Sequence, residues 1–176
     1  MRTDLHIHTT ASDGCWTPER VVEGVRATGI GLFAIADHDT TANVYTTEIL
    51  ARAAGLAFLR GVEVSTMVRD YGPKELTLHI LGYGIDPENQ TLQSVIRRND
   101  KLLKESDDAH IQDIIELGYD IDLDDYANYE HDRTRGGWRA LNYIIDQGIC
   151  ADVREFFRVL WPKMTHRWPD FAHPTE

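Results

Sequence analysis

The chain has 176 residues, a length that suits one domain or one domain with an inserted lobe. Its formal net charge of −11 opposes sequence-independent binding to nucleic acid or anionic membranes, so we expect no stable binding of duplex nucleic acid. An anionic substrate is still compatible with this charge, because bound divalent cations would reverse the local field.

The two cysteines, Cys15 and Cys150, provide no disulfide framework. No apolar run is long enough to span a bilayer, and the N-terminus has no signal-peptide pattern. We therefore expect a soluble, cytoplasmic protein without a membrane partner.

The first 60 residues alternate between strand and helix patterns. Thr17, Pro18 and Glu19 form a helix start, with an N-cap, a proline in the first turn and an acid near the positive end. A second helix is expected from Asn43 to Ala54. Alternating apolar and polar residues predict a strand at Leu5–Thr9, and short apolar runs predict strands at Leu32–Ala36 and Leu56–Leu59. This order is typical of a parallel α/β sheet or barrel.

The pattern changes after a further predicted strand at Leu76–Tyr83. Met67–Glu75 is expected to form a loop or hairpin turn before it. Beyond Asp86 the apolar spacing is helical, with a long helix that ends at Gly118. Acidic turns are expected at Asp120–Tyr129, a helix at Trp138–Gln147, and another from Asp152 to about Leu160. The prediction is a barrel portion at 1–86, a helical insertion lobe at 87–161, and the start of a return to the barrel at 162–176.

His6 and His8 flank Ile7 on the first predicted strand. Residues two apart on a strand point to the same face, so both imidazoles can reach one ion. The pattern alone is equally compatible with two ordinary polar strand residues.

Further metal-ligand residue types follow the other predicted strands. Asp13 lies in the loop after the first strand, His38 after the second, Glu63 after the third, and His79 on the next. Sites in parallel α/β folds gather at the carboxyl ends of strands. Imidazole and carboxylate groups suit zinc, manganese and iron. The pattern therefore predicts a site for two or three divalent ions.

Several segments resemble the polymerase and histidinol phosphatase (PHP) family. They are Asp4–Thr9, Ser12–Gly14 and Thr17–Glu19, then Ile35–Thr40, Gly61–Ser65 and His79–Tyr83. The helical lobe resembles the insertion of the small-molecule phosphoesterase branch, where the segment from Gly136 to Gly148 is suggestive. The resemblance implies an α/β fold, namely the N-terminal part of a distorted (β/α)7 barrel with an inserted all-helical lobe.

The resemblance also implies a ligand set and a reaction. His6 and His8 would hold one ion, Glu63 would bridge it to a second ion that His79 also binds, and Asp13 and His38 would serve a third. Glu63 and His38 are the predicted catalytic residues. The reaction would be hydrolysis of a small phosphate ester or nucleotide phosphate by a metal-activated water. An exonuclease that acts on short oligonucleotides is a neighbouring interpretation.

The family's later ligand motifs are not matched. Ala172-His173-Pro174 imitates one of them, but the residues before it do not have the pattern of a buried strand. His173 is therefore either a ligand or the opening of a helix. The alternative function is an inactive PHP half that binds metal and needs the missing C-terminal segment, a complementing chain or a homo-oligomer.

Arginines cluster at 133, 135 and 139, in a chain that has few positive charges. Guanidinium groups bind phosphate well, and Arg135 is the predicted substrate contact. A solvated helix face is the other interpretation. Asp39 could orient an imidazole or lie in an exposed turn. His110, His131 and His166 are expected at the surface, as are Asp107 and Asp108.

Overall fold

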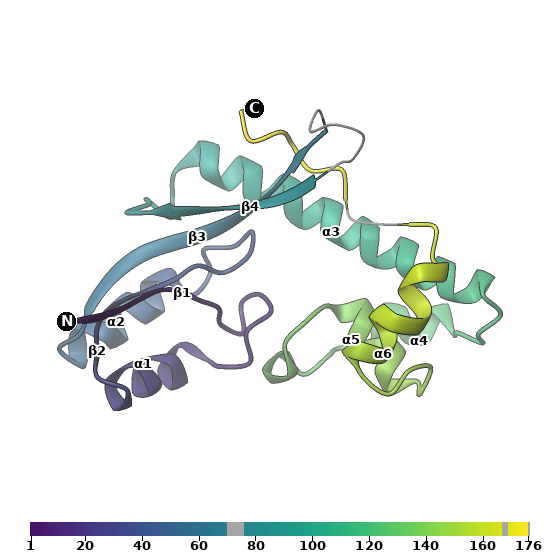
Figure 1. The fold of residues 1–176 in the computed structure, drawn as a ribbon, viewed down its shortest axis with the longest axis horizontal. Coiled ribbons are helices and arrows are strands. Elements are labelled where there is room, and N and C mark those ends of the chain that lie inside the picture. The colour runs from purple at the N-terminus through teal and green to yellow at the C-terminus, as the bar shows by residue number, and fades with distance from the viewer. Residues whose placement is uncertain (70–75, 167–168, 176) are drawn as a thin grey trace. The chain divides into compact units, whose positions relative to one another are not determined.

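The structure is a computed structural model that describes residues 1–69, 76–166 and 169–175 (Figure 1). The chain forms two compact units. The first, here called the sheet unit, contains Met1–Asp100, Arg133–Gly136 and Asp170–Glu176. The second, the helical unit, contains Lys101–Asp132 and Gly137–Pro169.

The sheet unit is built on four hydrogen-bonded strands in the order β1-β2-β3-β4. They are β1 (Arg2–Ile7), β2 (Ile30–Ile35), β3 (Ala57–Val68) and β4 (Leu76–Tyr83). β1 pairs with β2 and β2 with β3 in parallel, as the sequence predicts, whereas β3 and β4 are antiparallel. The parallel part of the sheet brings the carboxyl ends of β1 and β2 to one edge.

β3 is longer than the sequence predicts. Its first residues pair with β2 and its remaining residues with β4, in a curved strand that runs through both pairings (Figure 1). Gly61 lies at the changeover, where a Cβ atom would be 2.6 Å from the Ile35 carbonyl oxygen. The prediction of a loop from Met67 is wrong for Met67 and Val68, because β4 pairs with both. The rest of that predicted turn, 70–75, lies outside the described residues.

Two helices cover the sheet and form one apolar core with it. They are α1 (Pro18–Ala27) and α2 (Val44–Ala53). Thr17 caps α1 as predicted. The buried residues of this core are Val21, Val22, Val25, Phe33, Ile35, Val44 and Ala51.

A single long helix, α3 (Gln90–Glu116), begins in the sheet unit and ends in the helical unit. The helical unit also contains α4 (Leu123–Asn128), α5 (Arg139–Asp146) and α6 (Val153–Glu155). A π-helical turn at Phe156–Leu160 and a 3-10 turn at Trp161–Lys163 follow α6. Among the residues that the structure places, no helix has the length and apolar character needed to cross a lipid bilayer.

The helical unit corrects three predictions. The acidic segment expected to form turns contains α4, because the Asp122 side chain accepts hydrogen bonds from the Asp124 and Asp125 amides. His110 is buried beside Trp138 rather than exposed. Asp107 is half-buried, and its carboxylate accepts a hydrogen bond from the Ala140 amide.

Of the other two histidines expected at the surface, His131 is half-buried and His166 is exposed. The His166 ring nitrogen Nδ1 lies 2.9 Å from the buried carboxylate of Asp113.

Candidate metal centre

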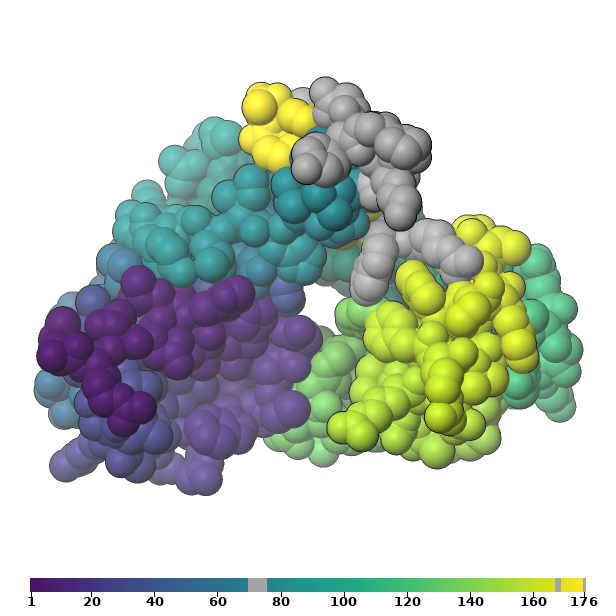
Figure 2. All heavy atoms as spheres, viewed as in Figure 1, coloured from purple at the N-terminus to yellow at the C-terminus, as the bar shows by residue number. Residues whose placement is uncertain are grey.

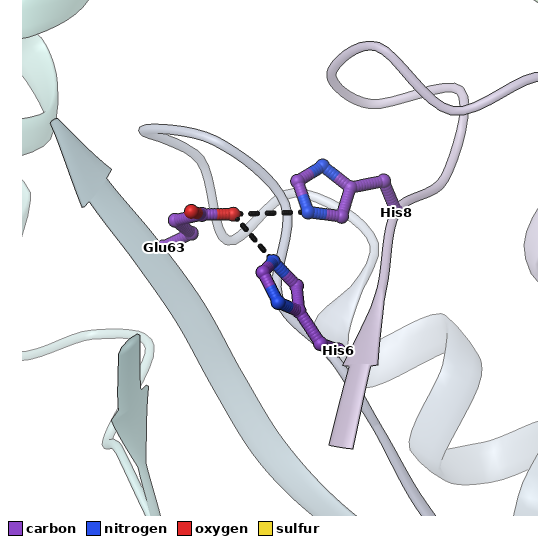
Figure 3. A group of neighbouring side chains, drawn as sticks. All are labelled: His6, His8 and Glu63. Atoms are coloured by element: carbon purple, nitrogen blue, oxygen red, sulfur yellow. Dashed lines mark hydrogen bonds and ion pairs between the residues drawn. The ribbon is translucent and has the colours of Figure 1, made fainter. Parts of the chain in front are cut away.

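The first two candidate ligands come from the end of β1. His6 is on the strand and His8 directly follows it, while Ile7 between them packs against the apolar core. Figure 3 shows both imidazoles directed at the carboxylate of Glu63. The alternation of side chains along β1 therefore separates the candidate ligands from the core, as the sequence predicts.

The segment after β2 is fixed to β3 by its backbone. The Glu63 amide donates to the Asp37 carbonyl oxygen at 3.1 Å, and the Asp39 amide donates to the Glu63 carbonyl oxygen at 2.8 Å. His38 lies between these bonds and forms an isolated parallel bridge with Glu63. The main chain thus places these two side chains next to each other.

Glu63 is the centre of the cluster, with a side chain only 6% exposed. Its Oε2 atom lies 2.7 Å from His6 Nε2 and 3.0 Å from His8 Nε2. The same oxygen is 3.6 Å from His38 Nδ1, and Oε1 is 3.2 Å from His79 Nδ1. One buried carboxylate is therefore surrounded by four imidazoles, two on strands β1 and β4 and two in the segments that follow β1 and β2.

Asp13 approaches the same histidines from the loop after β1. Its Oδ1 lies 2.7 Å from His8 Nδ1, and its Oδ2 lies 3.8 Å from His38 Nε2. The six predicted ligands thus form three overlapping groups among the described residues: His6 with His8 and Glu63, His8 with Asp13 and His38, and His38 with Glu63 and His79.

The chemistry of these groups fits divalent transition metals. Each group provides three donor atoms within 4.8 Å of one another, and imidazole with carboxylate is a common ligand set for zinc, manganese and iron. The buried Nδ1 atom of His38 has no hydrogen-bond partner. An ion that this nitrogen coordinates would satisfy it.

The protonation states also favour cation binding. Burial alone would raise the pKa of the Glu63 carboxyl, but the His6 hydrogen bond and the neighbouring imidazoles lower the pKa overall. The hydrogen bond with His8 lowers the pKa of Asp13 to about 2. Burial lowers the pKa of His38. At neutral pH, two carboxylates and a neutral His38 imidazole are therefore available as ligands.

His8 behaves differently. Burial opposes its protonation, but the hydrogen bond and charge of Asp13 outweigh burial and raise the pKa of this imidazole. Protons therefore compete with an ion for His8 more strongly than for an ordinary imidazole.

Asp37, which has no predicted role, organises the loop that carries Asp13. Its buried carboxylate accepts hydrogen bonds from the Thr9 amide, the Thr9 hydroxyl and the Ser12 hydroxyl, each at 2.7 Å. Asn43 donates to the same Thr9 hydroxyl at 2.8 Å. The sequence signal was an aspartate directly after a buried strand, beside a candidate ligand.

The exposed-turn interpretation of Asp39 is wrong. Asp39 is only 4% exposed and has a φ angle of 49°. Its carboxylate accepts hydrogen bonds from the Ser65 amide and the Asn99 side chain. These bonds tie the segment after β2 to β3 and to α3.

Arg135 is exposed at the end of a 3-10 turn, Arg133–Arg135, in the sheet unit. His173 belongs to none of the three candidate groups of described residues. Its ring accepts or donates a hydrogen bond at Thr175, while the Ala172 carbonyl oxygen accepts from the Met67 amide on β3. Figure 2 shows these C-terminal residues in yellow against teal atoms of the sheet unit.

The fold and the cluster together define an α/β domain with histidine and carboxylate side chains gathered at strand ends. The PHP domain model matches residues 4–150, and the chain belongs to this family.

Three characterised relatives are similar to the chain. A 3',5'-nucleoside bisphosphate phosphatase of Chromobacterium violaceum is 29% identical and covers 94% of this chain and 58% of the relative. A phosphoribosyl 1,2-cyclic phosphate 1,2-diphosphodiesterase of Eggerthella lenta is 31% identical, over 70% of this chain and 46% of the relative. A 5'-3' exoribonuclease of Escherichia coli is 44% identical, over 47% of this chain and 27% of the relative. The chain thus spans about half of these relatives or less.

Two solved structures are similar in fold. One, from Chromobacterium violaceum, is described as an amidohydrolase with bound sulfate and no metal; its TM-score is 0.71 at 28% identity, covering 90% of this chain and 54% of that chain. The other, from Bifidobacterium adolescentis, is described provisionally as a metal-dependent phosphoesterase. Its TM-score is 0.78 at 25% identity, and the match covers 99% of this chain and 60% of that chain. These likenesses confirm the predicted PHP-type α/β fold.

Proposed function

We propose that this chain supplies the metal centre of a phosphoric ester hydrolase that acts on a small phosphate ester or a nucleotide phosphate. The observation that carries the proposal is the buried Glu63 carboxylate, which lies between 2.7 and 3.6 Å from four imidazoles with Asp13 beside two of them. The names of the relatives, all of which concern phosphate esters, support the reaction class.

Two or three divalent ions, of manganese, zinc or iron, would be held by the three groups of ligands. When bound, such ions offset the charge of phosphoryl oxygens and lower the pKa of water. Glu63, His8 and His38 each belong to two of the three groups. We assign the catalytic roles to Glu63, whose two carboxylate oxygens face different histidines, and to His38, whose buried Nδ1 atom has no hydrogen-bond partner.

The chain's own residues would hold the ions and orient the substrate. Asp13 and Glu63 would attract the ions, because neighbouring imidazoles hold the pKa of each carboxyl low and both groups are ionised at neutral pH. Arg135 is the last residue of the turn that precedes Gly136, the contact with the Asp13 loop, and its guanidinium would bind a phosphate oxygen outside the ion cluster. No side-chain nucleophile is needed for this hydrolysis, because a metal-activated water would attack the phosphate ester.

The central test compares Glu63→Gln with the wild-type chain. The substitution keeps the size of the side chain and removes the charge that two ion sites share. Release of phosphate from a nucleoside 3',5'-bisphosphate in added manganese should fall by at least about a hundredfold. Glu23→Gln, on an exposed face of α1, is the control. Ordinary turnover by Glu63→Gln would end the proposal.

Substrate class can be separated with three probes: a nucleoside 3',5'-bisphosphate, a short 5'-phosphorylated oligoribonucleotide and a 1,2-cyclic ribose phosphate. The proposal predicts turnover of the first and weaker turnover of the other two.

The alternative proposal is a metal-binding PHP half that is inactive without a further polypeptide segment. It is favoured by the share of the relatives that the chain spans. A chain that binds two ions and turns over none of the three probes would support it.

A further inference from the structure

The loop that carries Asp13 is in close contact with backbone on two sides. On one side is Gly14, where a Cβ atom would lie 2.3 Å from the His8 carbonyl oxygen. On the other side is Gly136, where a Cβ atom would lie 2.5 Å from the Asp13 carbonyl oxygen and 3.2 Å from Cys15 Sγ. Real Cβ atoms essentially never approach backbone so closely, so both glycines are required by contact.

Gly136 is held in place by its own turn. Its amide donates to the Arg133 carbonyl oxygen at 3.1 Å, which closes the 3-10 turn Arg133–Arg135. Its φ angle of +68° is one that glycine adopts without strain. A side chain at this position would therefore have to push the Asp13 backbone and the turn apart, because its Cβ atom would lie 2.5 Å from the Asp13 carbonyl oxygen.

The Asp13 carboxylate has little room for such a shift. It is directed at His8 at 2.7 Å and at His38 at 3.8 Å, and these three residues form one of the three candidate ion groups. Metal ligation tolerates deviations of only about 0.2 Å in ligand distance. A displacement of the Asp13 backbone by a few tenths of an ångström would thus degrade this group and leave the other two intact.

We propose that Gly136 is a positioning residue for the ion group of His8, Asp13 and His38. It allows the Arg133–Arg135 turn to pack against the Asp13 backbone and so fixes the Asp13 carboxylate. The inference rests on the proposed metal centre. It also links the turn that carries Arg135 to one specific ion site.

The neighbouring glycine provides a matched control. Gly137 has a φ angle of +73°, so a side chain there carries the same backbone strain. Its Cβ atom, however, would meet only the flexible Asn142 side chain, at an ordinary 3.6 Å. Gly136→Ala and Gly137→Ala therefore differ in the contact with Asp13 and not in backbone conformation. Gly136→Asn and Gly137→Asn form a second pair with less strain, because asparagine tolerates positive φ.

A first readout needs no metal. Cys15 is exposed and Cys150 is buried, so alkylation of the native chain reports Cys15. If Gly136→Ala separates the turn from the loop, alkylation of Cys15 should become faster, whereas Gly137→Ala should leave its rate at the wild-type value. Equal rates in the two variants would overturn the proposed contact.

The second readout is calorimetric titration of the wild-type chain and both variants with Mn²⁺. Gly136→Ala or Gly136→Asn should lower the affinity for one ion by about 10- to 100-fold and leave the affinities for the others unchanged. In an Asp13→Asn background, the same substitution should have no further effect. If the wild-type chain binds Mn²⁺ and the Gly136 and Gly137 variants bind it with equal affinities, this inference alone is overturned. A wild-type chain that binds no Mn²⁺ would instead overturn the proposed metal centre.

Discussion

His38 and Glu63 form a parallel β-bridge three residues beyond Ile35 and Arg60, the last pair between β2 and β3. The bridge places a loop residue and a strand residue in register, with their side chains 3.6 Å apart at His38 Nδ1 and Glu63 Oε2. Because backbone hydrogen bonds hold both positions, the cluster is organised before any ion binds. Such preorganisation reduces the conformational entropy that ion binding must overcome.

Asp37 should be essential to this organisation. Asp37→Asn replaces one acceptor oxygen with a donor among three donors from Thr9 and Ser12. We expect the free energy of unfolding to fall by about 1–3 kcal/mol, since a buried donor loses its partner. Urea unfolding measures the change. Asp120→Asn, at an exposed position, should change it by less than about 0.5 kcal/mol. Equal small effects of the two substitutions would contradict the role given to Asp37.

Arg135 should contribute to substrate binding more than to turnover. Arg135→Gln removes a charge-assisted hydrogen bond to phosphate, so kcat/KM should fall by about 10- to 100-fold, mainly through a higher KM. Steady-state kinetics with a nucleoside bisphosphate measures the two constants. Arg26→Gln, near the end of α1, is the charge-matched control. If both variants had the wild-type KM, the solvated-face interpretation of Arg135 would be preferred.

Asp107 should make the stability of the helical unit depend on pH. Burial raises the pKa of this carboxyl from 3.8 to about 6, against the hydrogen bond from Ala140. The folded state therefore binds more protons than the unfolded state between these values, and stability is lost as the pH rises from about 4 to 6.

Asp107→Asn should remove this loss, with the free energy of unfolding at pH 7 rising by about 1–3 kcal/mol. At pH 4 the variant and the wild type should be similar. Denaturant unfolding at both pH values tests the prediction, with the exposed neighbour Asp108→Asn as control. A gain of the same size at pH 4 would show that the effect is not one of charge burial.

The sheet unit could be predicted from sequence where the signals are local. The cap at Thr17, the valine stripe of α1 and the apolar run of β2 each lie within a few residues. The close backbone contact at Gly136 and the length of β3 depend on residues that are more distant in the chain. The local pattern predicts a loop at Met67, whereas β3 continues to Val68 because its last residues pair with β4.

The candidate site shows the same division. The gathering of His8, Asp13 and His38 was predictable, because parallel strands bring their carboxyl ends together. Glu63 and His79 join them from the antiparallel pair of β3 and β4, which the order of the strands does not predict. Asp37 and Gly136 were not assigned roles, since their partners lie 28 and 123 residues away in Thr9 and Asp13. His110 was expected at the surface because the aromatic residues that bury it are Trp138 and Trp161.

The central claim is that the cluster around Glu63 holds two or three divalent ions, and the most direct measurement is the metal content of the purified chain. Elemental analysis after dialysis against manganese, zinc or iron should give two or more ions per chain, and fewer in Glu63→Gln. One ion or none in the wild-type chain, or the same number in Glu63→Gln, would contradict the account.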